Sequence, residues 1–304
     1  MPTWNSEQYL KFGDERTRPC RDLAARIAVP DARRVIDLGC GPGNSTEVLA
    51  LRWPDAEITG LDSSGAMLET ARKSQPEREW LQGDIVEWAR ESGGPRYDVV
   101  FANASLQWIP GHAANFPRIL TRAAPAGAFA AQLPGNHEGP THRLMRDIAA
   151  SPAWRQWFPT GKVPEWHSSN LAHYYDVLAP HATRLDIWET TYLHIFSAAE
   201  DIVEWYKGSG MRPYLEAIDS EEERQRFMVE YLEAIRPLYR PQSDGRVLFP
   251  FRRLFMIAYR EAKRVSATKL IPAPTRSCLL QAALATFLRP ARHPAASRLP
   301  KVRR

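Results

Sequence analysis

Short apolar runs alternate with amphipathic segments over the first half of the chain. Five runs rich in apolar and β-branched residues are predicted strands, at 33–37, 57–62, 78–84, 97–103 and 127–133. Apolar residues at three- and four-residue spacing predict helices between them, over 45–53, 65–73 and 115–124. This alternation is typical of βαβ units and a parallel sheet. We therefore predict a doubly wound α/β sheet with its ligand crevice at the carboxyl ends of the strands.

The pattern changes after residue 133 to Trp- and His-rich amphipathic segments over 139–179. Two further strands are predicted at 184–196 and 245–260, and helices are predicted over 198–208 and 220–239. The late strands complete a seven-stranded, mostly parallel Rossmann-like sheet, and the inserted helices form a lid over the crevice. The predicted segments are an N-terminal helical lid (1–30), a nucleotide-binding core (31–133), a helical cap with the last two strands (134–260) and a tail (261–304).

Positive charge is concentrated in that tail. The 304 residues include 40 Lys and Arg and 35 Asp and Glu, with a pI of about 9.2. Ten of these basic residues and one acidic residue lie in 261–304, so residues 1–260 hold 30 basic and 34 acidic residues. We therefore expect no specific nucleic-acid partner for the mildly acidic body. The Pro-, Ala- and Arg-rich tail has one amphipathic stretch, 276–289, and is expected to be disordered, with membrane-surface or polyanion binding as the alternative.

No segment predicts secretion or membrane insertion. The first 19 residues are too polar for a signal peptide, and no run of about 18 apolar residues occurs. We therefore expect a soluble, cytoplasmic protein. The three cysteines, Cys20, Cys40 and Cys278, lie far apart without the spacing of a disulfide framework or a metal site. They are predicted to be reduced thiols, and no metal is expected.

The strongest motif is VIDLGCGPGNST (35–46), which follows the first predicted strand. Glycines stand at every second position of its loop, at Gly39, Gly41 and Gly43. Glycines let the backbone pass close to a ligand, and the next helix presents free N–H groups to it. The dinucleotide pattern needs a glycine where Asn44 stands. The loop therefore favours S-adenosylmethionine, with Asn44 among its contacts and Asp37 placed to orient the ammonium group of its methionine end.

Acidic residues end the next two predicted strands. Asp62 follows Gly41 by about 21 residues, close to the offset at which a carboxylate meets a ribose hydroxyl. Two vicinal hydroxyls can donate to one carboxylate. The third strand ends in Gly83, Asp84 and Ile85. There the acid is placed to accept from an adenine amine, and the isoleucine to pack on the ring.

Polar residues also emerge where the fourth strand ends. Asn103 and Ala104 are placed near the expected sulfonium, and Gln107 and Trp108 are placed to bound the pocket for methyl transfer. For Trp108 a core position is an equal alternative. His112, which follows a Pro-Gly turn, is expected at the surface rather than in catalysis.

Further motifs carry a narrower resemblance. They are WNSEQYLKFGDERTRP (4–19), GLDSSGAML (60–68), NASLQW (103–108), AAQLPGN (130–136), WYKGSGMRPYL (205–215) and LFPFRRLF (248–255). With them, residues 1–260 resemble the trans-aconitate 2-methyltransferases of the seven-strand methyltransferase superfamily. The resemblance implies S-adenosylmethionine as the cofactor, adds Ser63 and Met67 to its contacts, and implies a monomethyl ester of trans-aconitate as the product.

This implied reaction needs no general base, because a carboxylate with a pKa of about 4 is already an anion at neutral pH. Proximity is expected to supply catalysis, and cations to bind the other carboxylates of a small polycarboxylate. Basic candidates in the lid segments are Arg16, Arg18, His142, Arg143, Lys207, Arg212, Arg252 and Arg253. Neutral candidates for hydrogen bonds to this substrate are Tyr9, Gln132, Asn136 and Tyr214.

Three other functions stay open at this level. A methyltransferase for another small acceptor, such as a malonyl thioester or a phenol, would share every cofactor residue. A nicotinamide-dependent dehydrogenase is disfavoured by the glycine spacing. A non-catalytic or nucleic-acid-binding module would depend on the basic tail alone. The sequence does not determine the oligomeric state.

Overall fold

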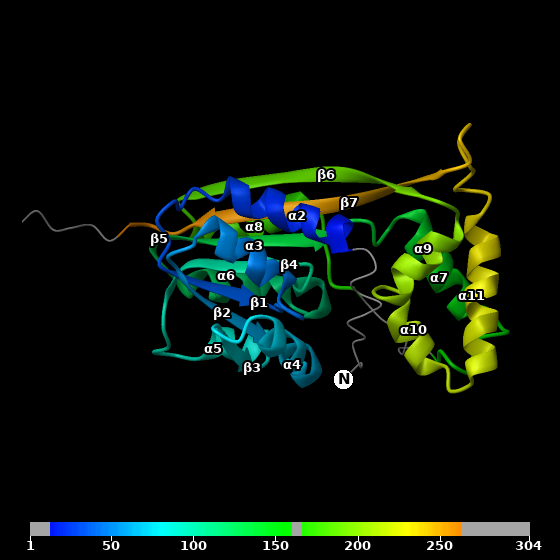
Figure 1. Cartoon of the computed structure of the whole chain (residues 1–304), viewed down its shortest axis with the longest axis horizontal. Coiled ribbons are helices and arrows are strands. Elements are labelled where there is room, and N and C mark those ends of the chain that lie inside the picture. The colour runs from blue at the N-terminus through cyan, green and yellow to red at the C-terminus, as the bar shows by residue number, and fades with distance from the viewer. Residues whose placement is uncertain (1–12, 160–165, 263–304) are drawn as a thin grey trace, which may run out of the picture. The chain divides into compact units, whose positions relative to one another are not determined.

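One seven-stranded sheet organises the part of the chain that the computed structural model describes, residues 13–159 and 166–262 (Figure 1). Its strands are β1 (Arg34–Leu38), β2 (Glu57–Asp62), β3 (Glu79–Gln82), β4 (Tyr97–Asn103), β5 (Ala123–Pro134), β6 (Arg184–Phe196) and β7 (Val247–Tyr259). Their order is β3-β2-β1-β4-β5-β7-β6. The first five strands are parallel, and β7 runs antiparallel to both β5 and β6. The predicted doubly wound, mostly parallel sheet is confirmed.

The helices fall where the amphipathic pattern predicts them, with several additions. They are α2 (Gly13–Arg26), α3 (Asn44–Arg52), α4 (Gly65–Ser74), α5 (Ile85–Arg90), η1 (Leu106–Trp108), α6 (His112–Thr121), α7 (Pro140–Ala150), α8 (Leu171–Leu178), η2 (Ala179–His181), α9 (Glu200–Lys207), α10 (Arg212–Ala217) and α11 (Glu221–Ile235). Within the described ranges, no helix is both long and apolar enough to cross a membrane.

The two faces of the sheet are covered by different helices. Helices α2 and α3 pack on one face, in a core that includes Leu23, Leu49 and Phe101. Helices α5, α6 and α8 cover the other face, where Phe116 and Tyr174 are fully buried. Burial on both faces accounts for the nearly continuous apolar composition of the central strands.

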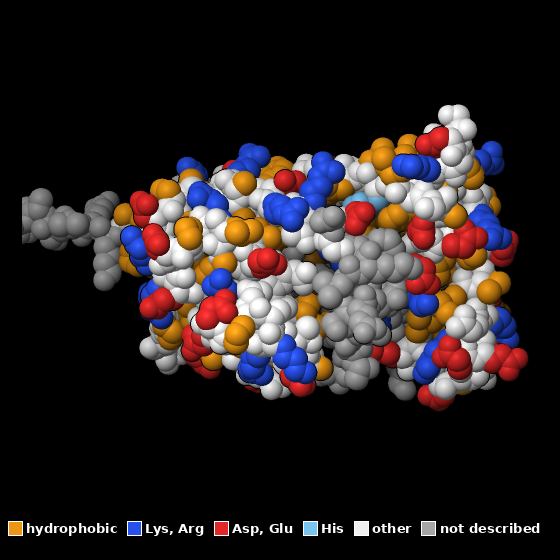
Figure 2. Space-filling model, viewed as in Figure 1, with side chains coloured by type: hydrophobic (Ala, Val, Ile, Leu, Met, Phe, Trp, Pro, Cys, Tyr) orange, Lys and Arg blue, Asp and Glu red, His pale blue; other side chains and the backbone are white. Residues whose placement is uncertain are grey.

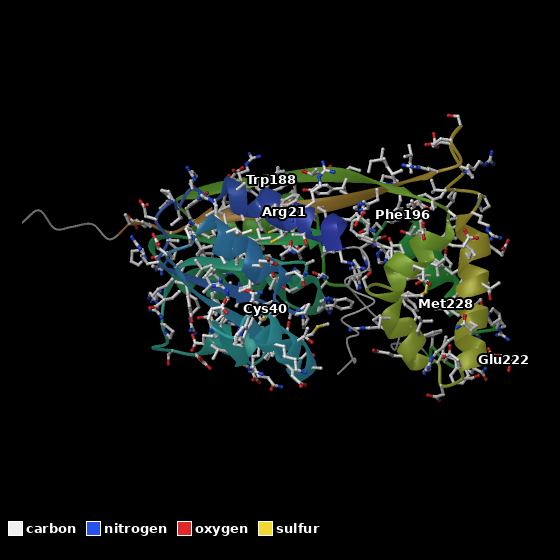
Figure 3. The ribbon with its side chains drawn as sticks, in the orientation of Figure 1. Arg21, Cys40, Trp188, Phe196, Glu222 and Met228 are labelled. Atoms are coloured by element: carbon white, nitrogen blue, oxygen red, sulfur yellow. The ribbon has the colours of Figure 1, made fainter. Side chains whose placement is uncertain are left out.

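A separate helical cluster lies beyond the carboxyl ends of the parallel strands, where Figure 1 shows α7, α9, α10 and α11 gathered. Its apolar core joins these helices to the first part of β7. Phe196 and Met228, labelled in Figure 3, both belong to it. The arrangement places helices at the edge of the sheet where the crevice is predicted. The boundaries predicted for the four segments 1–30, 31–133, 134–260 and 261–304 stay predictions.

Helix α2 is attached to the sheet by polar and aromatic contacts. The guanidinium of Arg26 donates to Asp186 at 2.7 Å and lies 4.2 Å from the ring centroid of Trp188. The hydroxyl of Tyr192 donates to Asp22 at 2.5 Å. In Figure 3, Arg21 of α2 and Trp188 of β6 are labelled in this region. These contacts bring the first turn of α2 to the carboxyl ends of the strands.

Charge is mixed on the described surface. In Figure 2, Lys and Arg side chains alternate with Asp and Glu over the face in view. Most of the tail predicted over 261–304, including Cys278, lies outside the described residues.

Candidate active site

A cavity of about 330 Å³ lies at the carboxyl ends of β1 to β4. Its volume is in the range of sites for small molecules and cofactors. It is lined by twelve of the fourteen residues predicted to contact the cofactor: Gly39, Gly41, Asn44, Asp62, Ser63, Met67, Gly83, Asp84, Ile85, Asn103, Ala104 and Trp108. The four parallel strands thus bring together residues that are up to 69 positions apart in the sequence.

Each glycine of the loop after β1 is needed for a different structural reason. Gly39 has a φ of 72°, and a Cβ there would lie 2.3 Å from the Cβ of Ser105. Ser105 approaches so closely because its hydroxyl donates to the Leu38 carbonyl at 2.6 Å. Gly41 has a φ of 56° and lines the cavity, with no atom of the described residues within 4 Å of the position of a Cβ. Its backbone is therefore accessible to a ligand.

Asp37 and Gly43 lie behind the cavity wall. The Asp37 carboxylate is fully buried and accepts from the hydroxyls of Ser45 at 2.6 Å and Thr46 at 2.8 Å. Burial raises the pKa of Asp37 to about 6, while the two hydroxyl bonds oppose the rise. Asp37 thus holds the first turn of α3 against β1. A Cβ on Gly43 would lie 2.8 Å from Gln75.

Asp62 faces the cavity and also holds the glycine loop. One carboxylate oxygen accepts from the Gly41 N–H at 2.9 Å, and the other from the Ser64 N–H at 2.8 Å. Partial burial raises the pKa of Asp62, and the backbone hydrogen bonds oppose the rise. A carboxylate has about four acceptor positions, so these two bonds leave capacity for ligand hydroxyls.

Asp84 has a structural role beside its place on the cavity wall. It is the N-cap of α5, and its Oδ1 accepts from the N–H groups of Val86 at 2.7 Å and Glu87 at 3.0 Å. Ile85, the first residue of α5, is buried and lines the same wall. The cap fixes where this acid and isoleucine stand relative to the end of β3.

Basic and aromatic residues line the opposite part of the cavity. Arg16 and Arg212 reach it from α2 and α10, beside Trp108. Arg16 donates to the carbonyl of Trp205 at 3.1 Å, and its guanidinium carbon lies 4.5 Å from the centroid of that ring. Arg212 is 8% exposed, and its guanidinium lies 3.7 Å from Glu216 and 5.8 Å from the Trp108 ring. Two guanidinium groups thus stand at one end of the cavity.

A second, smaller cavity of about 40 Å³ adjoins the first, and the two share Arg16, Ala104 and Trp108. Arg253 of β7 lines it, is only 4% exposed, and lies over the Phe251 ring at 4.4 Å. The two cavities together bring three arginines from α2, α10 and β7 around one tryptophan.

Four other basic candidates lie elsewhere. The guanidinium carbon of Arg18 lies 5.1 Å from the centroid of the Tyr192 ring, and Arg143 donates to the Glu138 carbonyl at 2.8 Å. The Lys207 ammonium lies 2.9 Å from the Glu204 carboxylate, and the Arg252 guanidinium lies 3.6 Å from the Glu189 carboxylate. In the described ranges, none of the four lines either cavity.

The remaining substrate candidates lie in the interior or outside the described residues. Gln132 is fully buried in β5, and Asn136 donates to the Tyr206 hydroxyl at 2.8 Å. His142 packs against Trp166 with ring centroids 4.4 Å apart, and burial lowers its pKa to about 3. Tyr214 is buried in the apolar cluster of the cap. Tyr9 lies outside the described residues.

Sequence reasoning missed one side of the cavity. Gly13, Thr17 and Cys20 of α2 line it together with Arg16. Their spacing of three or four residues puts them on one helical face, a pattern that can be read from the sequence. The other lining residues not predicted are Cys40, Pro42, Ser45, Ser105 and Ile109.

The fold and the match to a known domain define the class of protein. Residues 35–127 match the family described as a methyltransferase domain. The fold resembles the YcgJ protein from Bacillus subtilis, at 12% identity, with a TM-score of 0.51 over 80% of this chain and 99% of that one. A putative methyltransferase from Bacillus halodurans, 14% identical, has a TM-score of 0.50 over 81% of this chain and 100% of its own. The chain is a methyltransferase with a Rossmann-like fold.

Closer relatives identify the particular family. A trans-aconitate 2-methyltransferase from Azoarcus sp. is 48% identical over 260 residues, which cover 86% of this chain and 100% of the relative. One from Rhodopseudomonas palustris is 44% identical, again over 86% of this chain and 100% of the relative. The chain belongs to the trans-aconitate 2-methyltransferase family, and the predicted resemblance is confirmed.

Proposed function

We propose that the protein transfers a methyl group from S-adenosylmethionine to a carboxylate oxygen of trans-aconitate. The products are a monomethyl ester and S-adenosylhomocysteine. The supporting observation is the lining of the two adjoining cavities. The larger one is lined by the glycine loop, Asp62 and Asp84, and three arginines, Arg16, Arg212 and Arg253, line one or both cavities together with Trp108. The names of the relatives support trans-aconitate as the acceptor.

The residues present fit S-adenosylmethionine. The open backbone at Gly41 and the N-terminus of α3 at Asn44 suit its methionine carboxylate. Asp62, Asp84 and Ile85 line the cavity. In this proposal Asp62 accepts from the ribose hydroxyls, and Asp84 with Ile85 holds the adenine. When bound, S-adenosylmethionine supplies an electrophilic methyl group on a sulfonium.

The chain's own residues then have to place an anion and exclude water. A carboxylate at neutral pH already has the lone pair that forms the new carbon–oxygen bond, so no side chain has to remove a proton. A guanidinium stays cationic even where it is buried, so the buried Arg212 and Arg253 and the half-buried Arg16 can pair with carboxylates in the planar, two-bond arrangement. Trp108 and Ile109 line the cavity, and their apolar side chains would exclude water from the reacting groups once both ligands are bound. Correct placement alone is worth about 7–11 kcal/mol in favourable cases.

Turnover of an acceptor panel tests this function. Purified protein is incubated with S-adenosylmethionine and, separately, trans-aconitate, a malonyl thioester and a phenol, and products are identified by mass spectrometry. We expect a monomethyl ester of trans-aconitate as the dominant product. Preferential methylation of the thioester or the phenol would contradict the proposed acceptor and leave the methyltransferase class intact.

A further inference from the structure

A buried histidine–tyrosine pair contacts the two segments that carry Trp108 and Trp166, the tryptophans that line the smaller cavity. His112 is the first residue of α6, Tyr174 lies in α8, and the two helices pack against each other. His112 is 6% exposed and Tyr174 is fully buried. The Nδ1 atom of His112 lies 2.9 Å from the Tyr174 hydroxyl, and its Nε2 lies 2.9 Å from the Leu106 carbonyl. The expected surface position of His112 is therefore wrong.

The partners of this pair determine one hydrogen-bond pattern. A carbonyl only accepts, so Nε2 carries the proton and donates to Leu106. Nδ1 therefore accepts from the Tyr174 hydroxyl, whose oxygen in turn accepts from the Ser169 N–H at 3.1 Å. Burial lowers the pKa of His112 by more than the hydrogen bond to the Leu106 carbonyl raises it, which favours this neutral form.

The pair connects two segments that carry cavity residues. Leu106 opens the short helix η1, which ends at Trp108. Ser169 and Trp166 both belong to the described residues 166–170, which precede α8. Trp108 and Trp166 pack edge to face with ring centroids 5.5 Å apart, and both line the smaller cavity. A second bond, from the His167 N–H to the Gln107 carbonyl at 2.9 Å, joins the same segments.

We propose that His112 and Tyr174 are positioning residues for the methyl acceptor, because their hydrogen-bonded pair sets the position of Trp166 relative to Trp108. Among the described residues, neither member of the pair lines either cavity, so they act through Leu106 and Ser169. This inference rests on the proposed function, which places the acceptor beside Trp108. The cofactor wall formed by Asp62 and Asp84 has no hydrogen bond to this pair.

Tyr174→Phe tests the pair with the loss of a single oxygen. The ring remains stacked on Phe116, with centroids 5.2 Å apart and planes within 10°. The variant leaves the Ser169 N–H and the His112 Nδ1 without their partner. We expect the KM for trans-aconitate to rise by about fivefold or more, with kcat and the affinity for S-adenosylhomocysteine within about twofold of the wild type. The control is Tyr175→Phe at the adjacent, 53% exposed tyrosine. This control should leave the KM, kcat and the affinity for S-adenosylhomocysteine unchanged.

Two His112 variants test the same hydrogen-bonded pair from the histidine side. His112→Gln keeps one donor and one acceptor, whereas His112→Phe keeps only a ring to stack on Phe116. We expect His112→Gln to recover part of the rise in KM that His112→Phe causes. An unchanged KM in Tyr174→Phe, with only a lower melting temperature, would reduce the pair to a structural role. If Tyr174→Phe does not fold, equal KM values in the two His112 variants would overturn the proposal.

The proposed function and the positioning role fail in distinguishable ways. A wild-type protein that does not methylate trans-aconitate contradicts the proposed function alone, and the variants are then compared with the acceptor that the panel identifies. A wild-type protein that methylates trans-aconitate, together with variants of unchanged KM, contradicts the positioning role alone.

Discussion

Gly39 and Ser105 are in contact where the loop after β1 passes the end of β4, and a Cβ at position 39 would lie 2.3 Å from the Ser105 Cβ. The two residues belong to motifs that are far apart in the sequence. Their contact couples the shape of the glycine loop to the segment that carries Ala104, whose own φ of 53° is unusual for a residue with a side chain. The glycine loop and the segment that leads to Trp108 are thus joined at one point.

Alanine substitutions in the glycines separate steric clash from backbone strain. Gly93→Ala is the control, since Gly93 has a φ of 83° and no described atom within 4 Å of a Cβ position, and it should cost about 1–2 kcal/mol of stability. Gly39→Ala should cost more because it adds the clash with Ser105. Gly41→Ala should match the control in stability and lose affinity for S-adenosylhomocysteine. Denaturant unfolding and calorimetry measure both quantities, and equal unfolding free energies for Gly39→Ala and Gly93→Ala would contradict the clash.

Asp62→Ala should weaken the binding of S-adenosylhomocysteine by about 1–3 kcal/mol. The substitution removes the acceptor for ligand hydroxyls and also frees the N–H groups of Gly41 and Ser64. The control is Asp55→Ala, at an acid whose side chain is 82% exposed. Titration calorimetry measures the affinity, and equal affinities of Asp62→Ala and the wild type would remove Asp62 from the site.

Ionisation of Asp37 should destabilise the fold as pH rises. The pKa of Asp37 is raised from 3.8 to about 6 in the folded protein, so the folded state binds this proton more tightly than the unfolded state. Its contribution is fully present below about pH 4 and is lost as pH rises through about 6, with a size on the order of 2–3 kcal/mol. Asp37→Asn does not titrate. The unfolding free energy of the wild type, relative to that of Asp37→Asn, should therefore fall between about pH 4 and pH 7, and a parallel pH dependence of the two proteins would contradict the raised pKa.

Arg253 and Arg252 form a matched pair for the acceptor site. Arg253→Met should raise the KM for trans-aconitate by about 10-fold to 150-fold, the equivalent of a charge-assisted bond of about 1.5–3 kcal/mol. Arg252→Met should leave KM nearly unchanged, because that side chain contacts Glu189 and the Gly135 carbonyl instead. Lys207→Met is a second control, since this ammonium pairs with Glu204. Steady-state kinetics on the three variants checks this, and a larger effect of Arg252→Met would place the acceptor elsewhere.

The rate of methyl transfer should be nearly independent of pH between about 6.5 and 9. The acceptor carboxylate is an anion over the whole range, so no proton has to be removed from it. The measurement is kcat/KM for trans-aconitate against pH in one mixed buffer. A rise with unit slope would indicate a titrating base or an acceptor that must lose a proton.

Much of the fold and of the cavity lining at the carboxyl ends of the strands could be predicted from the sequence. Strands β2 and β4 have the bounds that the apolar runs predict, since a strand buried on both faces is apolar along its length. Strand β6 also has its predicted bounds, but it is a partly exposed edge strand that its β-branched and aromatic residues indicate. The glycine loop and Asp62 were recognised because a tight turn and a strand-end acid depend on local sequence. Helix α5 was missed because six residues are too few to establish helical periodicity, although Asp84 is a typical N-cap.

The direction in which side chains point was decided only by the tertiary structure. Asp37 was expected at the ligand, yet the hydroxyls of Ser45 and Thr46 draw its carboxylate behind the loop. Arg252 and Arg253 are adjacent in a strand, so local geometry puts them on opposite faces, but the pairing of β7 with β5 decides which face meets the cap. Likewise Arg212 reaches the cavity while Lys207 pairs with Glu204, because the packing of α9 and α10 orients each cation. Periodicity and turn chemistry act over a few residues, whereas the approach of one element to another depends on contacts between distant parts of the chain.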